Sequence, residues 1–348
     1  MSALAQKLAR RKLGRSAITV TEIGFGSAPI GNFRFNSSDD DAQAAMGAAW
    51  AAGGRLFDTS PFYGYGRAEL RVGRFLQGVA REDYVLSTKV GRWLRPLRPG
   101  DDLTGMRKGG LRFFPTVDYS YDGTMRSLEH SYLRLGLDRI DIALIHDVDA
   151  FTHGSDAAAE PHFDAAMAGA YRALDELRRN GQLGAIGVGI NDTRWCQRFV
   201  TAGDFDCAML AGQYTLLNHS EETLALFKSC RDKQVSLLMA GVFNSGILAG
   251  GSGSGAMYNY QAAPPEVIER VRRIEVIAAA HRVPLAAAAI QFVLAQPVVA
   301  SAVLGATSAA EVTANFAAYH LKIPARFWHE LRDEELIDRD VPLPGDPA

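Results

Sequence analysis

Short runs of apolar residues recur along the chain, and longer stretches with polar residues separate them. There are eight such runs, at residues 23–26, 55–57, 84–87, 140–145, 183–190, 207–211, 235–239 and 298–304. Most of them lack the alternation of apolar and polar residues that marks a strand with one face in water. Continuous apolar runs of this length are typical of strands that are buried on both faces of a parallel sheet. The pattern therefore predicts eight parallel strands.

The stretches between the runs carry apolar residues at helical spacing. Met125, Leu128 and Leu135 lie on one face of a predicted helix, which Gly136 ends. Residues 167–177 repeat this spacing. Strands that alternate with helices predict an α/β fold, and eight such units in about 300 residues predict a closed (β/α)₈ TIM barrel.

A doubly wound parallel sheet is the alternative fold for the same alternation. Such a sheet usually carries a glycine-rich phosphate-binding turn after its first strand. Here Gly24 and Gly26 are followed by Ser27, Ala28 and Pro29, so the dinucleotide-binding fingerprint fails. The barrel is the better prediction.

Three segments fall outside the alternation. Residues 11–22 predict an N-terminal β-hairpin, and residues 90–120 and 240–263 predict long loops after the third and seventh strands. Long loops inside compact folds are usually functional. We expect one domain, residues 1–348, with a core at about residues 12–322 and a C-terminal tail at residues 323–348.

Composition indicates a globular protein without nucleic-acid or membrane partners. The chain is 47% hydrophobic and 22% charged, with a formal net charge of -2, which does not favour binding to polyanions. The longest apolar candidate, residues 285–295, is too short for a membrane span. The pair Arg10 and Arg11 is not followed by the apolar stretch of an export signal. We expect a cytoplasmic protein, a monomer or homodimer, that acts on a small molecule.

The three cysteines, Cys196, Cys207 and Cys230, show no metal-binding or redox spacing. We expect them to be buried as small apolar residues in a reducing compartment.

Polar residues follow the apolar runs at the ends where a barrel of this kind carries its chemistry. These residues are Asp58, Lys89, His146, Asn191 and Gln213. Each of them alone could be a cap, a surface group or a satisfied core side chain. Their occurrence at five successive strand ends predicts a functional site.

Tyr63 follows Asp58 by five residues and is a candidate proton donor or acceptor. A free tyrosine has a pKa of about 10, which is too high for a good base near neutral pH. A nearby lysine ammonium lowers that pKa, so we expect Lys89 to lower the pKa of Tyr63. Asp58 would keep this lysine charged and oriented.

The remaining strand ends supply groups that hold ligands. His146 can bond to a substrate oxygen, and the amides of Asn191 and Gln213 can hold a carboxamide such as that of nicotinamide. A zinc-dependent hydrolase is an alternative, because His146, Asp147, Asp149 and His153 are crowded in the sequence. One strand alone supplies these four residues, so we expect no metal.

These motifs carry a family resemblance. Phe-Asp-Thr-Ser-Pro-Phe-Tyr-Gly at residues 57–64, Ser-Thr-Lys-Val-Gly at 87–91 and Leu-Ile-His-Asp at 144–147 are similar to the tetrad motifs of the aldo-keto reductase superfamily. The resemblance extends from about Lys12 to Asn315. It implies that Tyr63 is the general acid/base, that Asp58 and Lys89 tune it, and that His146 orients the substrate.

The resemblance also implies a nicotinamide cofactor. The positions implied are Asn191, Gln213, Phe243, Gly246, Leu248, Gly305, Thr307, Ser308, Glu311 and Asn315. Family members that prefer NADPH place lysine or arginine in the last of these segments. The carboxylate of Glu311 would instead repel a 2′-phosphate and can accept a bond from a ribose hydroxyl, so NAD is expected in preference to NADP.

Residues 241–248, Gly-Val-Phe-Asn-Ser-Gly-Ile-Leu, resemble the sugar-oxidising branch of this family. This implies NAD-dependent oxidation of an aldose such as L-fucose, D-arabinose or L-galactose at C1 to the lactone, with the hydride going to nicotinamide and the proton to Tyr63. Oxidation of pyridoxal at C4, general reduction of aldehydes or ketones, and a non-catalytic cofactor-binding barrel remain alternatives. The long loops are expected to supply Trp93, Phe113 and Tyr258 to the substrate pocket.

Overall fold

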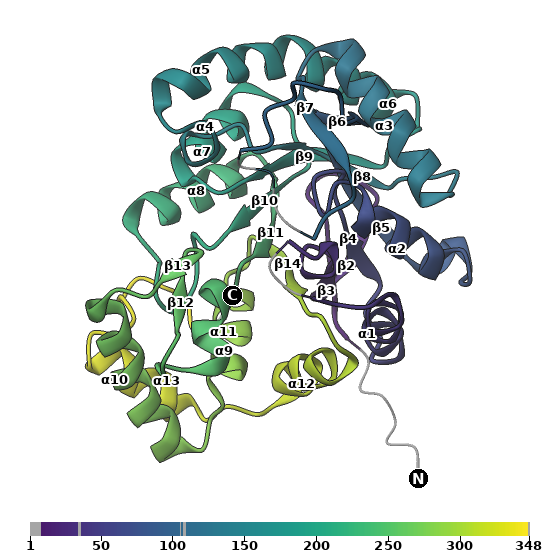
Figure 1. The fold of residues 1–348 in the computed structure, drawn as a ribbon. Coiled ribbons are helices and arrows are strands. Elements are labelled where there is room, and N and C mark those ends of the chain that lie inside the picture. The colour runs from purple at the N-terminus through teal and green to yellow at the C-terminus, as the bar shows by residue number, and fades with distance from the viewer. Residues whose placement is uncertain (1–7, 34–35, 105, 107–108, 347–348) are drawn as a thin grey trace.

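A computed structural model describes residues 8–33, 36–104, 106 and 109–346, and shows a closed barrel of eight parallel strands inside a layer of helices (Figure 1). The barrel strands are β3 (Ile23–Gly26), β4 (Leu56–Asp58), β5 (Val85–Val90), β8 (Ile142–His146), β9 (Ala185–Ile190), β10 (Cys207–Ala211), β11 (Ser236–Ala240) and β14 (Val299–Gly305). They pair in chain order, and β14 pairs with β3 to close the barrel. Each strand overlaps one of the eight apolar runs, so the predicted fold is confirmed. Residues 1–7 and 347–348, which the single-domain prediction included, lie outside the described residues.

The predicted N-terminal hairpin is present and closes one end of the barrel. It consists of β1 (Arg10–Lys12) and β2 (Thr19–Thr21), which pair in antiparallel fashion. Leu13 and Val20 are buried in the same cluster as Leu56, Ile142 and Cys207, and these three residues are the first residues of their strands. The hairpin therefore covers the N-terminal ends of the strands and leaves their C-terminal ends for a site.

Helices connect successive strands and cover the outside of the barrel. They are α1 (Asp39–Ala51), α2 (Arg67–Leu76), α3 (Tyr121–Leu135), α4 (Ala150–His153), α5 (Asp156–Ala165), α6 (Tyr171–Arg179), α7 (Thr193–Ala202), α8 (Glu221–Asp232), α9 (Ile247–Gly250), α10 (Pro265–His281), α11 (Leu285–Leu294), α12 (Ala309–His320) and α13 (Ala325–Asp333). Short turns are η1 (Pro29–Gly31), η2 (Arg81–Asp83), η4 (Asn244–Gly246) and the π-helical η3 (Ala166–Ala170). The predicted helix at Met125–Leu135 is α3, and Gly136 caps it with a φ of 62°.

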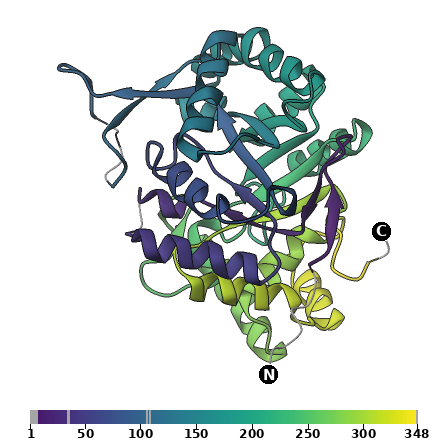
Figure 2. The same cartoon turned by 90° about the vertical axis from the view of Figure 1, so that its right-hand side faces the viewer.

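The two long insertions contain regular secondary structure. Strands β6 (Arg92–Pro96) and β7 (Phe113–Val117) pair in antiparallel fashion and project from the body of the barrel (Figure 2). Aromatic and β-branched residues favour these strands, and Arg95 forms an ion pair with Asp101 inside the hairpin. The insertion after β11 contains η4, α9 and a small hairpin of β12 (Met257–Tyr258) and β13 (Gln261–Ala262).

The C-terminal segment corrects the predicted core boundary. Residues 323–348 were expected to form a tail, but α13 packs against α10. The side chains of Phe327, Trp328, Leu331, Leu336, Ile337, Val341 and Leu343 are buried in the main core cluster. These apolar residues are numerous enough to dock the segment.

All three cysteines are free and buried, as predicted. Among the described residues, no single helix has the length and apolar content of a membrane span. Taken together α10 and α11 reach both, but the chain bends by 100° between them.

The docking of the C-terminal segment can be tested with Phe327→Ala. Phe327 is fully buried, so the variant should lower the free energy of unfolding by about 3–5 kcal/mol. Phe151 is 60% exposed, and Phe151→Ala should change it by less than about 0.5 kcal/mol. Urea unfolding followed by circular dichroism measures both variants. Equal stabilities for the two would contradict the docked segment.

Candidate active site

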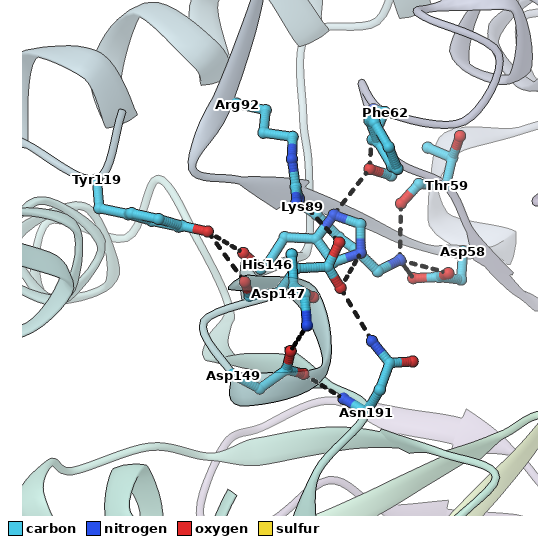
Figure 3. Close-up of polar contacts among 12 residues, drawn as sticks. Asp58, Thr59, Phe62, Lys89, Arg92, Tyr119, His146, Asp147, Asp149 and Asn191 are labelled. Atoms are coloured by element: carbon cyan, nitrogen blue, oxygen red, sulfur yellow. Dashed lines mark hydrogen bonds and ion pairs between the residues drawn. The ribbon is translucent and has the colours of Figure 1, made fainter. Parts of the chain in front are cut away.

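A buried ion pair lies at the C-terminal ends of two neighbouring strands. Lys89 on β5 donates from Nζ to Asp58 Oδ2 at 2.6 Å and to Oδ1 at 2.9 Å, and to the carbonyl oxygen of Thr59 at 3.0 Å (Figure 3). Ser87 Oγ also donates to Asp58 Oδ1, at 2.9 Å. Both side chains are almost completely buried. Burial raises the pKa of Asp58, and the Lys89 and Ser87 contacts oppose this rise.

Tyr63, on the turn after β4, lies over this pair. Lys89 Nζ is 4.8 Å from the centre of the Tyr63 ring, and the ring of His146 is 5.9 Å away, edge to face. Burial raises the pKa of Tyr63 well above 10, the negative charges of Asp58 and Asp147 add to the rise, and Arg92 opposes it.

This direction corrects the expectation that Lys89 would lower the pKa of Tyr63. The Lys89 ammonium donates two hydrogen bonds to Asp58, so its charge is largely balanced before it acts on the phenol. The raised pKa favours the protonated form of Tyr63.

His146, the last residue of β8, is held as a neutral imidazole. Burial lowers its pKa well below 6.5, and the charges of Arg92 and Lys89 lower it further. Its Nδ1 lies 3.3 Å from Ser60 Oγ, and its Nε2 lies 3.4 Å from Asp147 Oδ1. A carboxylate can only accept a hydrogen bond, so a proton on Nε2 suits the Asp147 contact and leaves Nδ1 to accept from Ser60. An Nε2–H donor is suited to hold a substrate oxygen.

A second ring of polar residues surrounds His146, and no sequence motif indicates its role. Arg92 Nη1 donates to Asp147 Oδ2 at 2.8 Å, and Asn191 Nδ2 donates to Asp147 Oδ1 at 3.2 Å. Tyr119 donates its hydroxyl to the carbonyl oxygens of His146 and Asp147, at 2.8 and 3.2 Å. Asp147 was considered only as a metal ligand, although its place directly after His146 puts it at the same strand end. Arg92 follows the Lys-Val-Gly motif by one residue and shows no other signal.

Asp149, the other carboxylate considered as a metal ligand, is fully buried and has a structural role. It accepts from the backbone nitrogens of Thr152 and Asn191, at 2.7 and 2.8 Å. No group of three or more His, Cys, Asp or Glu side chains in the described part of the chain is placed to hold a metal ion.

Gly212 and Gly241, which follow β10 and β11, form a glycine floor. Gly212 and Gly241 both have positive φ angles, and a Cβ on Gly241 would lie 2.9 Å from the backbone nitrogen of Gly212. The buried amide nitrogen of Asn244 lies beside this floor without a hydrogen-bond partner. Asn191 and the half-buried Gln213 flank the floor at the ends of β9 and β10. These groups fit a nicotinamide ring with its carboxamide.

The predicted adenosine segment follows β14. Ser308 caps the N-terminus of α12, whose positive dipole end suits a phosphate. Glu311 is exposed and accepts from the backbone nitrogen of Thr307 at 2.7 Å and from its hydroxyl at 3.1 Å. Asn315 is half-buried on the same helix, and Gly305, the last residue of β14, is exposed.

Other predicted cofactor residues are placed differently. The Leu248 side chain is buried in the core, and its backbone nitrogen donates to the carbonyl oxygen of Phe243. Phe243 itself packs, half-buried, against the core. Gly246 is exposed, and there is open space where a Cβ would stand.

The predicted pocket aromatics do not gather beside the tetrad. Trp93 donates to Asp118 and packs under the guanidinium of Arg126 on α3, because successive residues of β6 point to opposite faces and Arg92 takes the face toward the site. Phe113 is 37% exposed on the projecting hairpin. Tyr258 packs, half-buried, against the core.

Comparison with known proteins gives a consistent set of relatives. The Aldo/keto reductase family matches residues 22–334. The chain is 40% identical to pyridoxal 4-dehydrogenase of Microbacterium luteolum over 338 residues, which cover 94% of this chain and 98% of that protein. It is 38% identical to D-threo-aldose 1-dehydrogenase of a Pseudomonas species, with 92% and 96% covered.

The fold agrees with that of solved structures. An aldo-keto reductase of Bacillus halodurans superimposes with a TM-score of 0.73 at 23% identity, with 96% of this chain and 98% of that chain covered. At this level of identity the likeness shows the fold alone.

The raised pKa of Tyr63 can be tested by tyrosinate absorbance. The titration of Tyr63→Phe is subtracted from that of the wild type, which isolates the signal of Tyr63. A free tyrosine is half ionised at about pH 10, and we expect the difference signal to be nearly absent at that pH because burial and Asp58 disfavour the phenolate. Half ionisation at or below about pH 10 would show that Lys89 dominates after all.

Proposed function

Because this chain belongs to the aldo/keto reductase family, we propose that it oxidises an aldose at C1 to the lactone, with NAD as the preferred hydride acceptor. Membership of that family makes the protein an oxidoreductase. The proposal concerns its substrate, its cofactor preference and the roles of its residues. The observation that carries it is the constellation of Tyr63, Lys89, Asp58 and His146 at adjoining strand ends.

The oxidation removes a hydride from C1 and a proton from the hydroxyl on C1. Gly212, Gly241, Asn191 and Gln213 would hold a nicotinamide ring, which would supply the hydride acceptor when bound. Tyr63 exchanges the proton, and His146 holds the reacting oxygen through Nε2–H. In the direction of reduction Tyr63 already carries the proton that the carbonyl oxygen needs. In the direction of oxidation Tyr63 must first lose its proton, so the rate should rise with pH.

The two most similar relatives reported above support a cyclic hemiacetal as the substrate class. An aldose and pyridoxal differ in most groups, but each has an aldehyde that closes on a hydroxyl group of the same molecule. Oxidation of such a hemiacetal gives a lactone directly. The identities of 40% and 38% do not separate the two substrates. We place an aldose such as L-fucose, D-arabinose or L-galactose first and pyridoxal second.

Two further functions are kept as outcomes of the test. A general aldehyde or ketone reductase is favoured by the protonated state of Tyr63. A non-catalytic, cofactor-binding barrel is opposed by the well-formed Lys89–Asp58 pair beneath that tyrosine. A monomer or homodimer remains our prediction for the assembly.

The substrate proposal is tested by NADH formation. Purified protein with NAD is mixed in turn with L-fucose, D-arabinose, L-galactose, D-glucose and pyridoxal. We expect NADH from at least one of the first three sugars, and a loss of at least about 100-fold in Tyr63→Phe because the proton acceptor is removed. A signal from pyridoxal alone would select the second candidate. Carbonyl reduction with NADH, in the absence of any oxidation, would select the reductase.

The preference for NAD is tested with Glu311→Gln. This change removes the negative charge that would repel a 2′-phosphate and keeps an oxygen that can bond to Thr307. We expect the ratio of kcat/KM for NADP to that for NAD to rise by roughly threefold to tenfold. Glu222 lies in the first turn of α8, and Glu222→Gln should leave the ratio unchanged. An unchanged ratio in Glu311→Gln would assign the preference to other residues.

A further inference from the structure

The Asp147 carboxylate connects three parts of the site. Its Oδ1 accepts a hydrogen bond from Asn191 Nδ2 at 3.2 Å and lies 3.4 Å from His146 Nε2 (Figure 3). Its Oδ2 accepts a hydrogen bond from Arg92 Nη1 at 2.8 Å. The residue is 8% exposed and has a φ of 56°, in the left-handed region. An aspartate tolerates this region, yet a non-glycine residue there is uncommon. The backbone turns at this point and aims the carboxylate between the strand ends.

We propose that Asp147 is a positioning residue that orients both the substrate-holding His146 and the cofactor-holding Asn191, and that Arg92 of the β6–β7 hairpin holds it in place. The proposal rests on the proposed function for the identity of the two ligands. It assigns roles to Asp147 and Arg92, which the sequence motifs did not.

The contact with His146 selects the imidazole tautomer. Asp147 can only accept a hydrogen bond, so it keeps the proton on Nε2, the nitrogen that must donate to a substrate oxygen. The separation of 3.4 Å is long for a hydrogen bond. A substrate oxygen at a shorter distance can therefore replace Asp147 as the acceptor, and the tautomer is already correct when it does.

The contact with Asn191 sets the direction of its amide. Because Asp147 receives the amide nitrogen, the amide oxygen of Asn191 is turned away from the carboxylate. That oxygen can accept a hydrogen bond from the nitrogen of a nicotinamide carboxamide. Without Asp147 the amide would be able to flip and present the wrong group.

Arg92 reaches the carboxylate because of how the hairpin begins. Gly91 has a φ of 100°, and a Cβ there would lie 2.3 Å from the Tyr119 ring. Only glycine therefore allows the chain to turn from β5 into β6 at this point. The carbonyl oxygen of Arg92 accepts from Ser127 on α3 at 2.9 Å, which fixes the base of the hairpin. The Arg92 side chain is 7% exposed, so its pairing with Asp147 is shielded from water.

Asp147 and Arg92 also act on Tyr63, in opposite directions. The charge of Asp147 raises the pKa of Tyr63 and that of Arg92 lowers it. The other groups that face Tyr63 are Asp58 on β4, Lys89 on β5, His146 on β8 and Tyr260 on the turn between β12 and β13. Removing the Asp147 charge should move the rise of the oxidation rate to lower pH, and removing the Arg92 charge should move it to higher pH.

The experiment compares Asp147→Asn, Arg92→Gln and Arg95→Gln with the wild type. Arg95 lies on the same strand as Arg92 and pairs with Asp101 within the hairpin, so Arg95→Gln is the matched control. NAD and NADH dissociation constants are measured by fluorescence, and kcat/KM for oxidation is measured against pH. We expect Asp147→Asn and Arg92→Gln each to weaken cofactor binding by about threefold to tenfold. We expect the two variants to shift the pH profile in opposite directions. Arg95→Gln should change neither the binding nor the profile.

A double-mutant cycle separates orientation from general damage. In the Asn191→Ala background, Asp147→Asn should no longer weaken cofactor binding, because the amide that it orients is gone. Additive losses would overturn the proposal, as would pH profiles that stay unchanged or move in the same direction. If Asp147→Asn does not fold, the comparison of Arg92→Gln with Arg95→Gln tests the proposal, by the cofactor dissociation constants and the pH profile of kcat/KM.

Failure of the proposed function would be recognised separately. If the wild type forms NADH with no substrate, the oxidation proposal fails. Cofactor affinity and the tyrosinate titration of Tyr63 in the same variants then still test the role of Asp147. Opposite shifts in that titration would support it, and identical titrations would overturn it.

Discussion

The site depends on one buried ion pair, between Lys89 and Asp58. Taking two charges out of water is costly, and a buried pair persists only when its geometry and its remaining hydrogen bonds are good. Here Lys89 Nζ has three acceptors within 3.0 Å, and Asp58 has a further donor in Ser87. Neighbouring strands β4 and β5 bring these groups into register, since Asp58 pairs with Ser87 in the sheet. The barrel therefore supplies the geometry that offsets the cost of burying the two charges.

The balance of that pair explains the state of the residues above it. Asp58 balances much of the charge of Lys89, and burial is the largest cause of the raised pKa of Tyr63. The same dry surroundings keep His146 neutral. A protonated phenol and a neutral imidazole can both donate hydrogen bonds, and their rings lie 5.9 Å apart. On the proposed function, two such donors would stabilise a substrate oxygen that gains negative charge during hydride transfer.

The insertions adapt this general site to a particular chemistry. The β6–β7 hairpin contributes Arg92 from its base, while most of its length projects from the barrel. The insertion after β11 places Asn244 beside the Gly212 and Gly241 floor. Loops carried by a rigid barrel can vary while the strand ends stay fixed.

The sequence by itself determined the barrel and the tetrad. Runs buried on both faces leave a strong apolar signal, and the residues at their ends, Asp58, Lys89 and His146, stand out against it. Tyr63 was indicated by the resemblance of residues 57–64 to an aldo-keto reductase motif. The ordered β6–β7 hairpin and the docked segment at Phe327 left weaker local signals, because short strands and proline-flanked helices depend on the partners they pack against.

Only the tertiary structure decided how the charges combine. Arg92 and Asp147 are 55 residues apart, and no local pattern shows that they pair. The direction of the Tyr63 pKa likewise depends on which group takes the charge of Lys89 and on how much water is excluded. Electrostatic interactions depend on distances and burial in three dimensions, whereas hydrophobic periodicity can be detected from the order of the residues alone.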